Sequence, residues 1–230
     1  LAVVKLPEAV KNKWIKYHEP KNPSQINETR KINIERKSHP ELAKWAFQED
    51  AVQTFLDSKA GILEMATGTG KTRTSLKIVD KLIEENKINS VIVCTPANVD
   101  LATQWYEELI AYNFSNKPII SRHFSKIKEM DVFLQRVKTA KKPYFPVVIL
   151  FNNKLTDLID RDKQGNLSNS LLIADEVHNL GSPSNVKNLN GKLDNLTYKL
   201  GLSATPEREY DEIGQEFIDK EIGPTIFEFN

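Results

Sequence analysis

Five consecutive residues, "GTGKT" from Gly68 to Thr72, combine residue types that together bind phosphate groups. They follow the short apolar segment "GILEM" and precede apolar residues at helical spacing, so they join a predicted strand to a helix beginning near Lys71. Glycines at such a turn let backbone N–H groups point inward around a phosphate chain. Lys71 would reach the β and γ phosphates, and the Thr72 hydroxyl would hold magnesium. The pattern predicts a phosphate-binding loop, because a simple flexible turn would need neither side chain.

This predicted loop departs from the strict phosphate-loop pattern at one position. The strict pattern has a glycine six residues before the lysine, where this chain has Met65. The strand-to-helix context nevertheless supports the prediction. The residues expected to contact the nucleotide are Thr67, Gly68, Thr69, Gly70, Lys71 and Thr72.

A second group of chemically capable residues stands in "LLIADEVH". Asp175 follows four apolar residues, so its carboxylate is expected at the end of a buried strand, where it can bind the water shell of magnesium. Glu176 comes next, and a second carboxylate there can orient and deprotonate an attacking water, as hydrolysis requires. The alternative is a solvated acidic turn. His178 is less specific, because a histidine after a strand can also cap a helix or pack.

The elements around these motifs predict a parallel α/β fold. From Pro40 onward, helix-like segments alternate with continuous apolar runs such as "SVIVCTP", "YFPVVILFN" and "YKLGLSAT". Runs of this kind are typical of strands buried on both faces, and their alternation with helices predicts a mostly parallel sheet covered by helices on both sides. Ligands bind such sheets at the carboxyl ends of the strands, where the polar clusters of this sequence lie.

Composition limits the class of protein. The 230 residues are 40% hydrophobic and 27% charged, as in a soluble globular protein, and the longest apolar runs fall far short of the roughly 18 residues that a membrane span needs. The N-terminus does not resemble a secretory signal. The single cysteine, Cys94, lies in an apolar run and is expected to fill core volume. We therefore expect a cytoplasmic protein.

The first 38 residues differ from the rest in charge. Residues 1–38 hold nine Lys or Arg against four Asp or Glu, a balance of +5, which leaves −4 for residues 39–230 because the whole chain carries +1. This segment is rich in Asn and has little apolar periodicity, so we interpret it as a linker or extension. Contact of its basic residues with nucleic acid is the alternative.

Three motifs together resemble a known family. "MATGTGKT", "DEVH" and "LSATP", in this order and spacing, resemble motifs I, II and III of the superfamily 2 helicases and translocases. The similarity covers about residues 40–230 and corresponds to the first of that family's two RecA-like domains. "MATGTGKT" and "GLSATPER" are especially similar to a DEAH-like branch that includes the motor subunits of type I and type III restriction enzymes. The resemblance implies an ATP-dependent motor with ATP and Mg²⁺ as ligands.

The resemblance also implies roles for individual residues. Motif I would bind phosphates through Gly68, Gly70, Lys71 and Thr72. Motif II would supply the magnesium-binding acid, Asp175, and the general base, Glu176, while His178 links motif II to motif III. In motif III, Ser203 and Thr205 would couple the nucleotide state to movement along nucleic acid. An upstream glutamine that contacts adenine in the family corresponds by spacing to Gln48.

Nucleic-acid contacts are implied by "CTPANVDLATQW", which matches the family motif after the second strand. The positions of this motif are occupied here by Thr95, Pro96 and Gln104. Main-chain N–H and hydroxyl groups at these positions would contact phosphates and so bind nucleic acid without reading its sequence. Trp105 could stack on a base, but its helical spacing favours the core. After "VVILF" the threonine of many relatives is missing, and Phe151 or Asn152 stands there.

The resemblance favours DNA over RNA as the partner and restriction or defence as the setting, although the residues themselves do not exclude RNA. The chain ends without a second RecA-like domain, so we expect a fragment that is poorly active alone, with a nuclease or other subunits elsewhere. Two alternatives remain. A nucleotide-switched interaction module could dispense with Glu176, and a metabolic P-loop kinase should carry a lid and an acceptor pocket in place of "LSATP".

Replacement of Lys71 with Ala tests the predicted phosphate loop. The change removes a cation from the β and γ phosphates, so the affinity for ATP should fall while the fold survives. Binding of a fluorescent ATP analogue measures the affinity, and circular dichroism monitors the fold. Unchanged ATP affinity in a folded Lys71→Ala protein would rule out the phosphate-loop assignment.

Overall fold

The computed structural model describes residues 45–123, 127–205 and 211–229. The proposed N-terminal extension, residues 1–38, lies outside these ranges, as do Pro40 and Arg208. No helix in the described ranges combines the length and the apolar composition that crossing a membrane requires.

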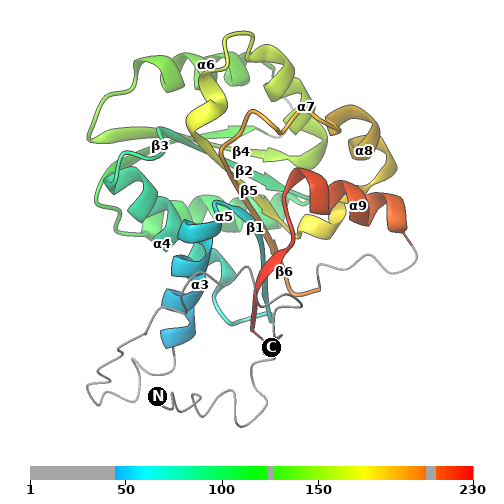
Figure 1. The fold of residues 1–230 in the computed structure, drawn as a ribbon. Helices are drawn as coiled ribbons and strands as arrows, with labels where there is room; N and C mark the ends of the chain where they lie inside the picture. The colour runs from blue at the N-terminus through cyan, green and yellow to red at the C-terminus, as the bar shows by residue number, and fades with distance from the viewer. Residues whose placement is uncertain (1–44, 124–126, 206–210, 230) are drawn as a thin grey trace, which may run out of the picture.

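The core of the structure is a seven-stranded sheet in the order β3-β4-β2-β5-β6-β1-β7, in which every described pair of neighbours is parallel (Figure 1). The prediction of a parallel α/β fold is confirmed. The strands are β1 (Ala60–Met65), β2 (Ser90–Thr95), β3 (Lys117–His123), β4 (Tyr144–Phe151), β5 (Ser170–Asp175), β6 (Tyr198–Ser203) and β7 (Thr225–Phe229).

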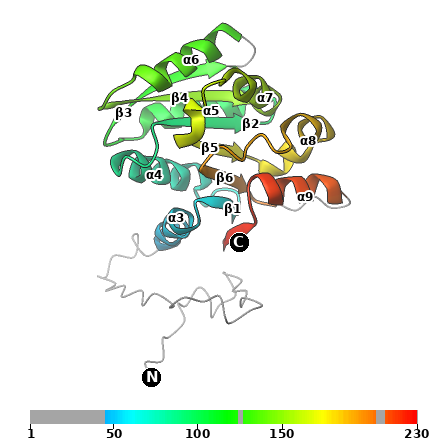
Figure 2. The same ribbon diagram turned by 45° about the horizontal axis from the view of Figure 1, so that its top comes forward.

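Helices cover both faces of the sheet (Figures 1 and 2). Buried residues of α3, α4 and α5 pack on one face and those of α6, α7, α8 and α9 on the other, each group forming its own apolar cluster. The helices are α3 (Ala46–Ser58), α4 (Lys71–Glu84), α5 (Val99–Ala111), α6 (Ile127–Thr139), α7 (Asn152–Arg161), α8 (Pro183–Leu189) and α9 (Glu212–Glu221), with 3₁₀ turns η2 (Asn166–Asn169) and η3 (Val177–Gly181).

Strand β2 shows why continuous apolar runs belong to the centre of this sheet. Its side chains alternate between the two clusters, with Val91 and Val93 in one and Ile92 and Cys94 in the other, and all six of its residues are buried. A strand covered on both faces therefore has no polar side, as its sequence predicts. Cys94 fills core volume, as expected, and burial raises the pKa of its thiol.

Local signals explain where the helices begin and end. The predicted helix after β2 starts where the Asn98 side chain accepts hydrogen bonds from the main-chain N–H groups of Asp100 and Leu101, at 2.9 and 3.2 Å. Helix α4 is followed by Asn86, which has a positive φ of 57° and turns the chain away. Helices α7, α8 and α9 and strand β7 were not predicted from the sequence.

Gly201 on β6 allows the helical layer to approach the sheet closely. A Cβ atom built at this position would lie 2.9 Å from Cγ1 of Ile62, 3.1 Å from Cγ2 of Val177 and 3.2 Å from Cγ2 of Ile222. These neighbours belong to β1, η3 and the end of α9, so the absent side chain lets three elements meet. The space is fully used, because each of these three side chains is buried.

Substitution of Gly201 by Ala and by Val tests this packing. Valine favours strands more than glycine does, so any loss of stability must come from steric overlap. We expect a destabilisation of about 1–3 kcal/mol for Ala and a larger loss for Val, measured by urea unfolding. Unfolding midpoints equal to that of the unmodified protein for both variants would contradict the packing described.

Candidate functional site

The loop that follows β1 has the backbone conformation expected of a phosphate cradle. Gly68 and Gly70 have positive φ values of 82° and 90°, which glycine adopts without steric cost. Gly70 immediately precedes α4, so the loop opens toward the N-terminus of a 14-residue helix. That helix end presents N–H groups and a partial positive charge, which together suit an anion. Thr67 and Gly68 are exposed at the tip of the loop.

Lys71 lies across the loop rather than pointing into solvent. Its Nζ donates a hydrogen bond to the main-chain oxygen of Met65 at 3.1 Å. Met65 is the last residue of β1, and its side chain is fully buried in the core. This explains the departure from the strict pattern, since the residue six positions before the lysine is a strand residue whose carbonyl, not its side chain, faces the loop.

Residues distant in sequence support the other side of the loop. The Gln48 side chain on α3 donates from Nε2 to the main-chain oxygen of Thr69 at 3.1 Å and is 2% exposed. A Cβ atom at Gly70 would lie 2.5 Å from the same Nε2, so the glycine is required for this contact. The structure thus places Gln48 directly against the loop, and the adenine contact that the resemblance implies stays a prediction.

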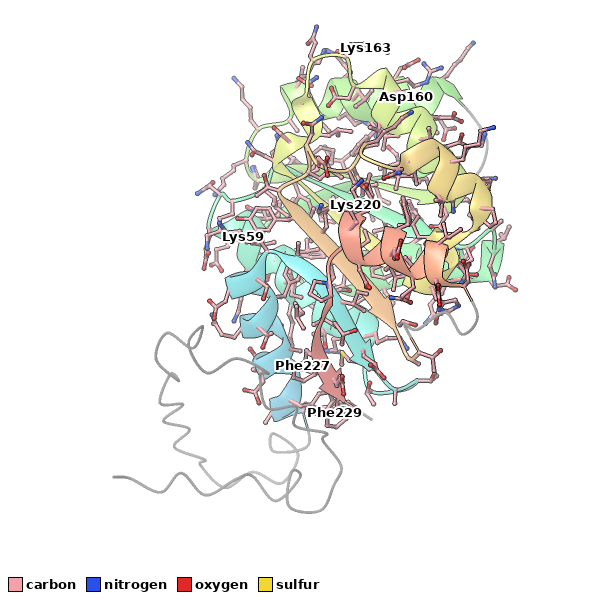
Figure 3. The ribbon with its side chains drawn as sticks, turned by 45° about the vertical axis from the view of Figure 1, so that its right-hand side comes forward. Lys59, Asp160, Lys163, Lys220, Phe227 and Phe229 are labelled. Carbon is pink, nitrogen blue, oxygen red and sulfur yellow. The ribbon has the colours of Figure 1, made fainter. Side chains whose placement is uncertain are left out.

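The last strand also contacts the loop, which the sequence analysis missed. The main-chain N–H of Ala66 donates to the carbonyl of Phe229 at 2.9 Å. The Phe229 ring stacks on Phe47 of α3, with centroids 3.7 Å apart and an interplanar angle of 6°. Figure 3 shows Phe227 and Phe229 at the end of β7, beside α3. The aromatic alternation in "TIFEF" could have indicated a strand, but not its position at this edge.

Asp175 ends β5 with its carboxylate almost completely enclosed. The residue is 5% exposed, its Oδ2 accepts a hydrogen bond from the Trp105 indole Nε1–H at 2.7 Å, and its Oδ1 accepts one from the main-chain N–H of Glu176 at 3.0 Å. Burial raises the pKa of Asp175, and the hydrogen bond from Trp105 and the positive charge of Lys71 partly offset this effect. Lys71 follows β1, and only β6 separates β1 from β5, so the two predicted motifs lie at the same edge of the sheet.

Trp105 packs in the core, the alternative that its helical spacing favoured, and is 1% exposed. Its hydrogen bond to Asp175 was not predicted from the sequence. No local signal predicts this contact, because the two residues are 70 positions apart.

Glu176 has a backbone conformation that is uncommon outside glycine, with φ 48° and ψ 55°. Such conformations cluster at functional sites, and here the chain turns abruptly from β5 into η3. The Glu176 side chain is 35% exposed, unlike its buried neighbour Asp175. The two carboxylates therefore occupy different environments, one enclosed and one open to water.

His178 connects the ends of β5 and β6. Its Nδ1 lies 3.2 Å from Oγ of Ser203 and 3.6 Å from Oε2 of Glu176. Ser203 is fully buried, and its Oγ also accepts a hydrogen bond from the main-chain N–H of Thr205 at 3.1 Å. The structure thus brings together the residues to which the resemblance assigns coupling.

Asn179, which the sequence analysis did not consider, determines which nitrogen of His178 carries the proton. Its Nδ2 lies 3.2 Å from the main-chain oxygen of Glu176 and 2.9 Å from Nε2 of His178. A carbonyl oxygen can only accept, so the Asn179 atom that faces it is the amide donor. The second N–H of the same amide then donates to Nε2, and in the neutral ring the proton lies on Nδ1, which faces Ser203 and Glu176.

The predicted nucleic-acid residues lie beside β2, next to β5 in the sheet. Thr95 is fully buried and its hydroxyl donates to the carbonyl of Pro96 at 3.0 Å, whereas Gln104 is exposed on α5. Thr95 could therefore reach nucleic acid only after a rearrangement, while Gln104 is accessible as it stands. Asn152 begins α7 at the end of β4 and is 6% exposed.

Solved structures share this fold. The structure is similar to that of the UvsW helicase from bacteriophage T4, with a TM-score of 0.57 and 19% identity, covering 78% of this chain and 58% of that one. The Hef helicase domain of Pyrococcus furiosus gives a TM-score of 0.56 and 17% identity, covering 80% and 38% of the two chains. The parallel sheet is therefore the RecA-like α/β fold of helicase domains.

The chain belongs to the family described as type III restriction enzyme, res subunit, whose profile matches residues 22–208. Among curated proteins, a DNA 3′-5′ translocase, XPB2, of Sulfurisphaera tokodaii is 32% identical over 181 residues, 79% of this chain and 34% of the relative. A Rad25 protein of Halobacterium salinarum is 29% identical over 166 residues, 72% of this chain and 24% of the relative. The chain thus spans about a third or less of these relatives.

The proton position on His178 can be tested by ¹⁵N NMR of the histidine rings, assigned with a His178→Gln variant. We expect the neutral ring to carry its proton on Nδ1 and to lose this preference in Asn179→Ala, because the amide donor is gone. Asn188→Ala, which changes an exposed asparagine of α8, is the matched control. A proton on Nε2 in the unmodified protein would show that the Asn179 amide is oriented the other way.

Proposed function

We propose that this chain is the ATP-binding motor domain of an ATP-dependent DNA helicase or translocase. Membership of the restriction-enzyme res family and the helicase fold support a motor function. The name of the XPB2 relative, a DNA 3′-5′ translocase, supports DNA as the nucleic acid. A restriction or defence setting, with a nuclease elsewhere in the assembly, is consistent with the family description.

The observation that carries the proposal is the convergence of Lys71 with Asp175. Lys71 begins α4 after β1, and Asp175 ends β5, with only β6 between these two strands. Both residues stand at the carboxyl ends of parallel strands in the order β5-β6-β1, so they face the same edge of the sheet and a single ligand can contact both. A triphosphate with a divalent cation is a ligand of this kind, since its phosphates need a cation donor and its metal needs an oxygen ligand.

The donors present fit magnesium bound together with ATP. No group of three or more His, Cys, Asp or Glu side chains forms a metal site within residues 45–123, 127–205 and 211–229. Mg²⁺ is commonly held by one or two protein oxygens together with substrate phosphates and water, and we propose Thr72 and Asp175 for the protein share. When bound, the metal neutralises the charge that develops on the phosphate oxygens.

The side chains of the site would then divide the chemistry between them. The N–H groups of the Gly68–Gly70 loop and the Lys71 ammonium hold the β and γ phosphates. Glu176 is exposed to water and accepts a proton from the attacking water molecule. The water oxygen then bonds to the γ-phosphorus, while the bond between the γ-phosphorus and the oxygen that bridges it to the β-phosphate breaks. Gln48 is assigned the adenine contact, which it can make only after a rearrangement, because its side chain is buried and its Nε2 donates to the Thr69 carbonyl. We further propose that a second RecA-like domain supplies the arginine that stabilises the transition state.

Replacement of Glu176 with Gln separates binding from hydrolysis. The amide keeps the shape of the side chain but loses its basicity, so the full-length protein should still bind ATP while its DNA-stimulated ATP turnover falls by about 10² or more. Phosphate release measures the turnover, and a fluorescent ATP analogue measures the binding.

Glu216→Gln, which alters an exposed glutamate of α9, is the matched control and should keep full turnover. Single-stranded DNA, duplex DNA and RNA of the same sequence are compared as stimulants. Turnover in Glu176→Gln equal to that of the unmodified protein would place the general base elsewhere, and stimulation by RNA alone would replace DNA as the proposed substrate.

A further inference from the structure

The contact between Trp105 and Asp175 joins two parts of the site that are separate in sequence. Trp105 lies on α5, the helix that follows the Thr95–Pro96 segment, and Asp175 ends β5. Strands β2 and β5 are neighbours, with Cys94 paired to Ala174. The helix that leaves β2 therefore passes over the end of β5, where the indole meets the carboxylate at 2.7 Å.

This hydrogen bond does more than satisfy a buried indole. Oδ2 receives the Trp105 N–H and Oδ1 receives the main-chain N–H of Glu176, so donors on both oxygens fix the rotation of the carboxyl group. Each carboxylate oxygen has more than one lone-pair site, so both keep acceptor capacity for a further ligand. A carboxylate held in one orientation binds a metal without first losing rotational freedom.

We propose that Trp105 is a positioning residue that orients Asp175 for magnesium, and that through it the helix carrying Gln104 is connected to the metal site. The inference rests on the proposed function, because it concerns the residue assigned to the metal there. Trp105 is 1% exposed and Asp175 is 5% exposed, so water does not compete for this hydrogen bond. Gln104 is adjacent to Trp105 and exposed on the same helix, so displacement of α5 by a bound nucleic acid moves the indole donor as well.

Trp105→Phe removes the N–H donor and keeps an aromatic ring in the core. We expect the Mg²⁺ concentration for half-maximal binding of a non-hydrolysable ATP analogue to rise by about 10-fold or more, as for other partners of metal-binding side chains. Binding of the same analogue in EDTA should stay unchanged, because it depends on the phosphate loop. If the substitution only disturbed core packing, the affinity for the analogue would fall both with Mg²⁺ and in EDTA, or would fall in neither.

Phe133→Leu is the matched control, since Phe133 is a fully buried aromatic of α6 in the opposite apolar cluster. Its Mg²⁺ dependence should equal that of the unmodified protein. An unchanged Mg²⁺ dependence in Trp105→Phe, together with a loss of it in Asp175→Ala, would overturn the inference and leave the proposed function standing. Absence of any Mg²⁺-dependent binding in the unmodified protein would overturn both.

The indole signal of Trp105 in the unmodified protein provides a second test, which does not depend on whether the Trp105→Phe variant folds. The chain has three tryptophans, so variants Trp14→Phe and Trp45→Phe assign the third indole N–H signal in a ¹H–¹⁵N spectrum to Trp105. We expect this signal to shift when Mg²⁺ is titrated in the presence of the ATP analogue, and to shift again when DNA is added. A signal that moves in neither titration would contradict the connection.

Discussion

The structure of the site depends on a carboxylate that is kept almost out of water. Enclosing a charged Asp175 costs on the order of several kcal/mol in lost hydration, so interactions with its surroundings must offset part of this free energy. The indole of Trp105, the main-chain N–H of Glu176 and the charge of Lys71 do so from α5, from the turn after β5 and from the start of α4. Strand β5 lies in the middle of the sheet, beside β2, which leads into α5, and one strand away from β1, which leads into α4.

The same constraint accounts for the abrupt turn after β5. The chain presents one acidic side chain to the interior and the next to water, and a left-handed backbone at Glu176 turns the chain out of β5 and into η3 at that residue. The 3₁₀ turn that follows brings His178 back to Ser203 at the end of β6. The uncommon backbone conformation at Glu176 thus falls on the residue that we propose as the general base.

Much of this arrangement could be predicted from the sequence, because its signals are local. Glycines before Lys71 and apolar runs ending in Asp175 define a loop and a buried strand by residue type alone. The contacts that complete the site are not local. Trp105 reaches Asp175 across two elements, and Phe229 joins the loop from the last strand, so only the packed sheet brings them together.

Asn179 illustrates a different limit of sequence reasoning. An asparagine within a 3₁₀ turn is ordinary in a sequence. The importance of this one comes from the distances of its amide nitrogen to the carbonyl of Glu176 and to Nε2 of His178. Periodicity also failed for β7, whose five residues are only partly buried and lie at the edge of the sheet. A strand of that kind lacks the continuous apolar run of β5, and the aromatic alternation of its five residues does not show where in the sheet it lies.

The enclosed thiol of Cys94 has a practical consequence for studying motion in this protein. The only cysteine in the 230 residues is fully buried, and its raised pKa keeps it in the unreactive thiol form at neutral pH. A cysteine introduced at an exposed position such as Gln104 can therefore be labelled selectively with a maleimide dye while the native residue stays in place. Fluorescent reporters can be attached to this domain without altering its core.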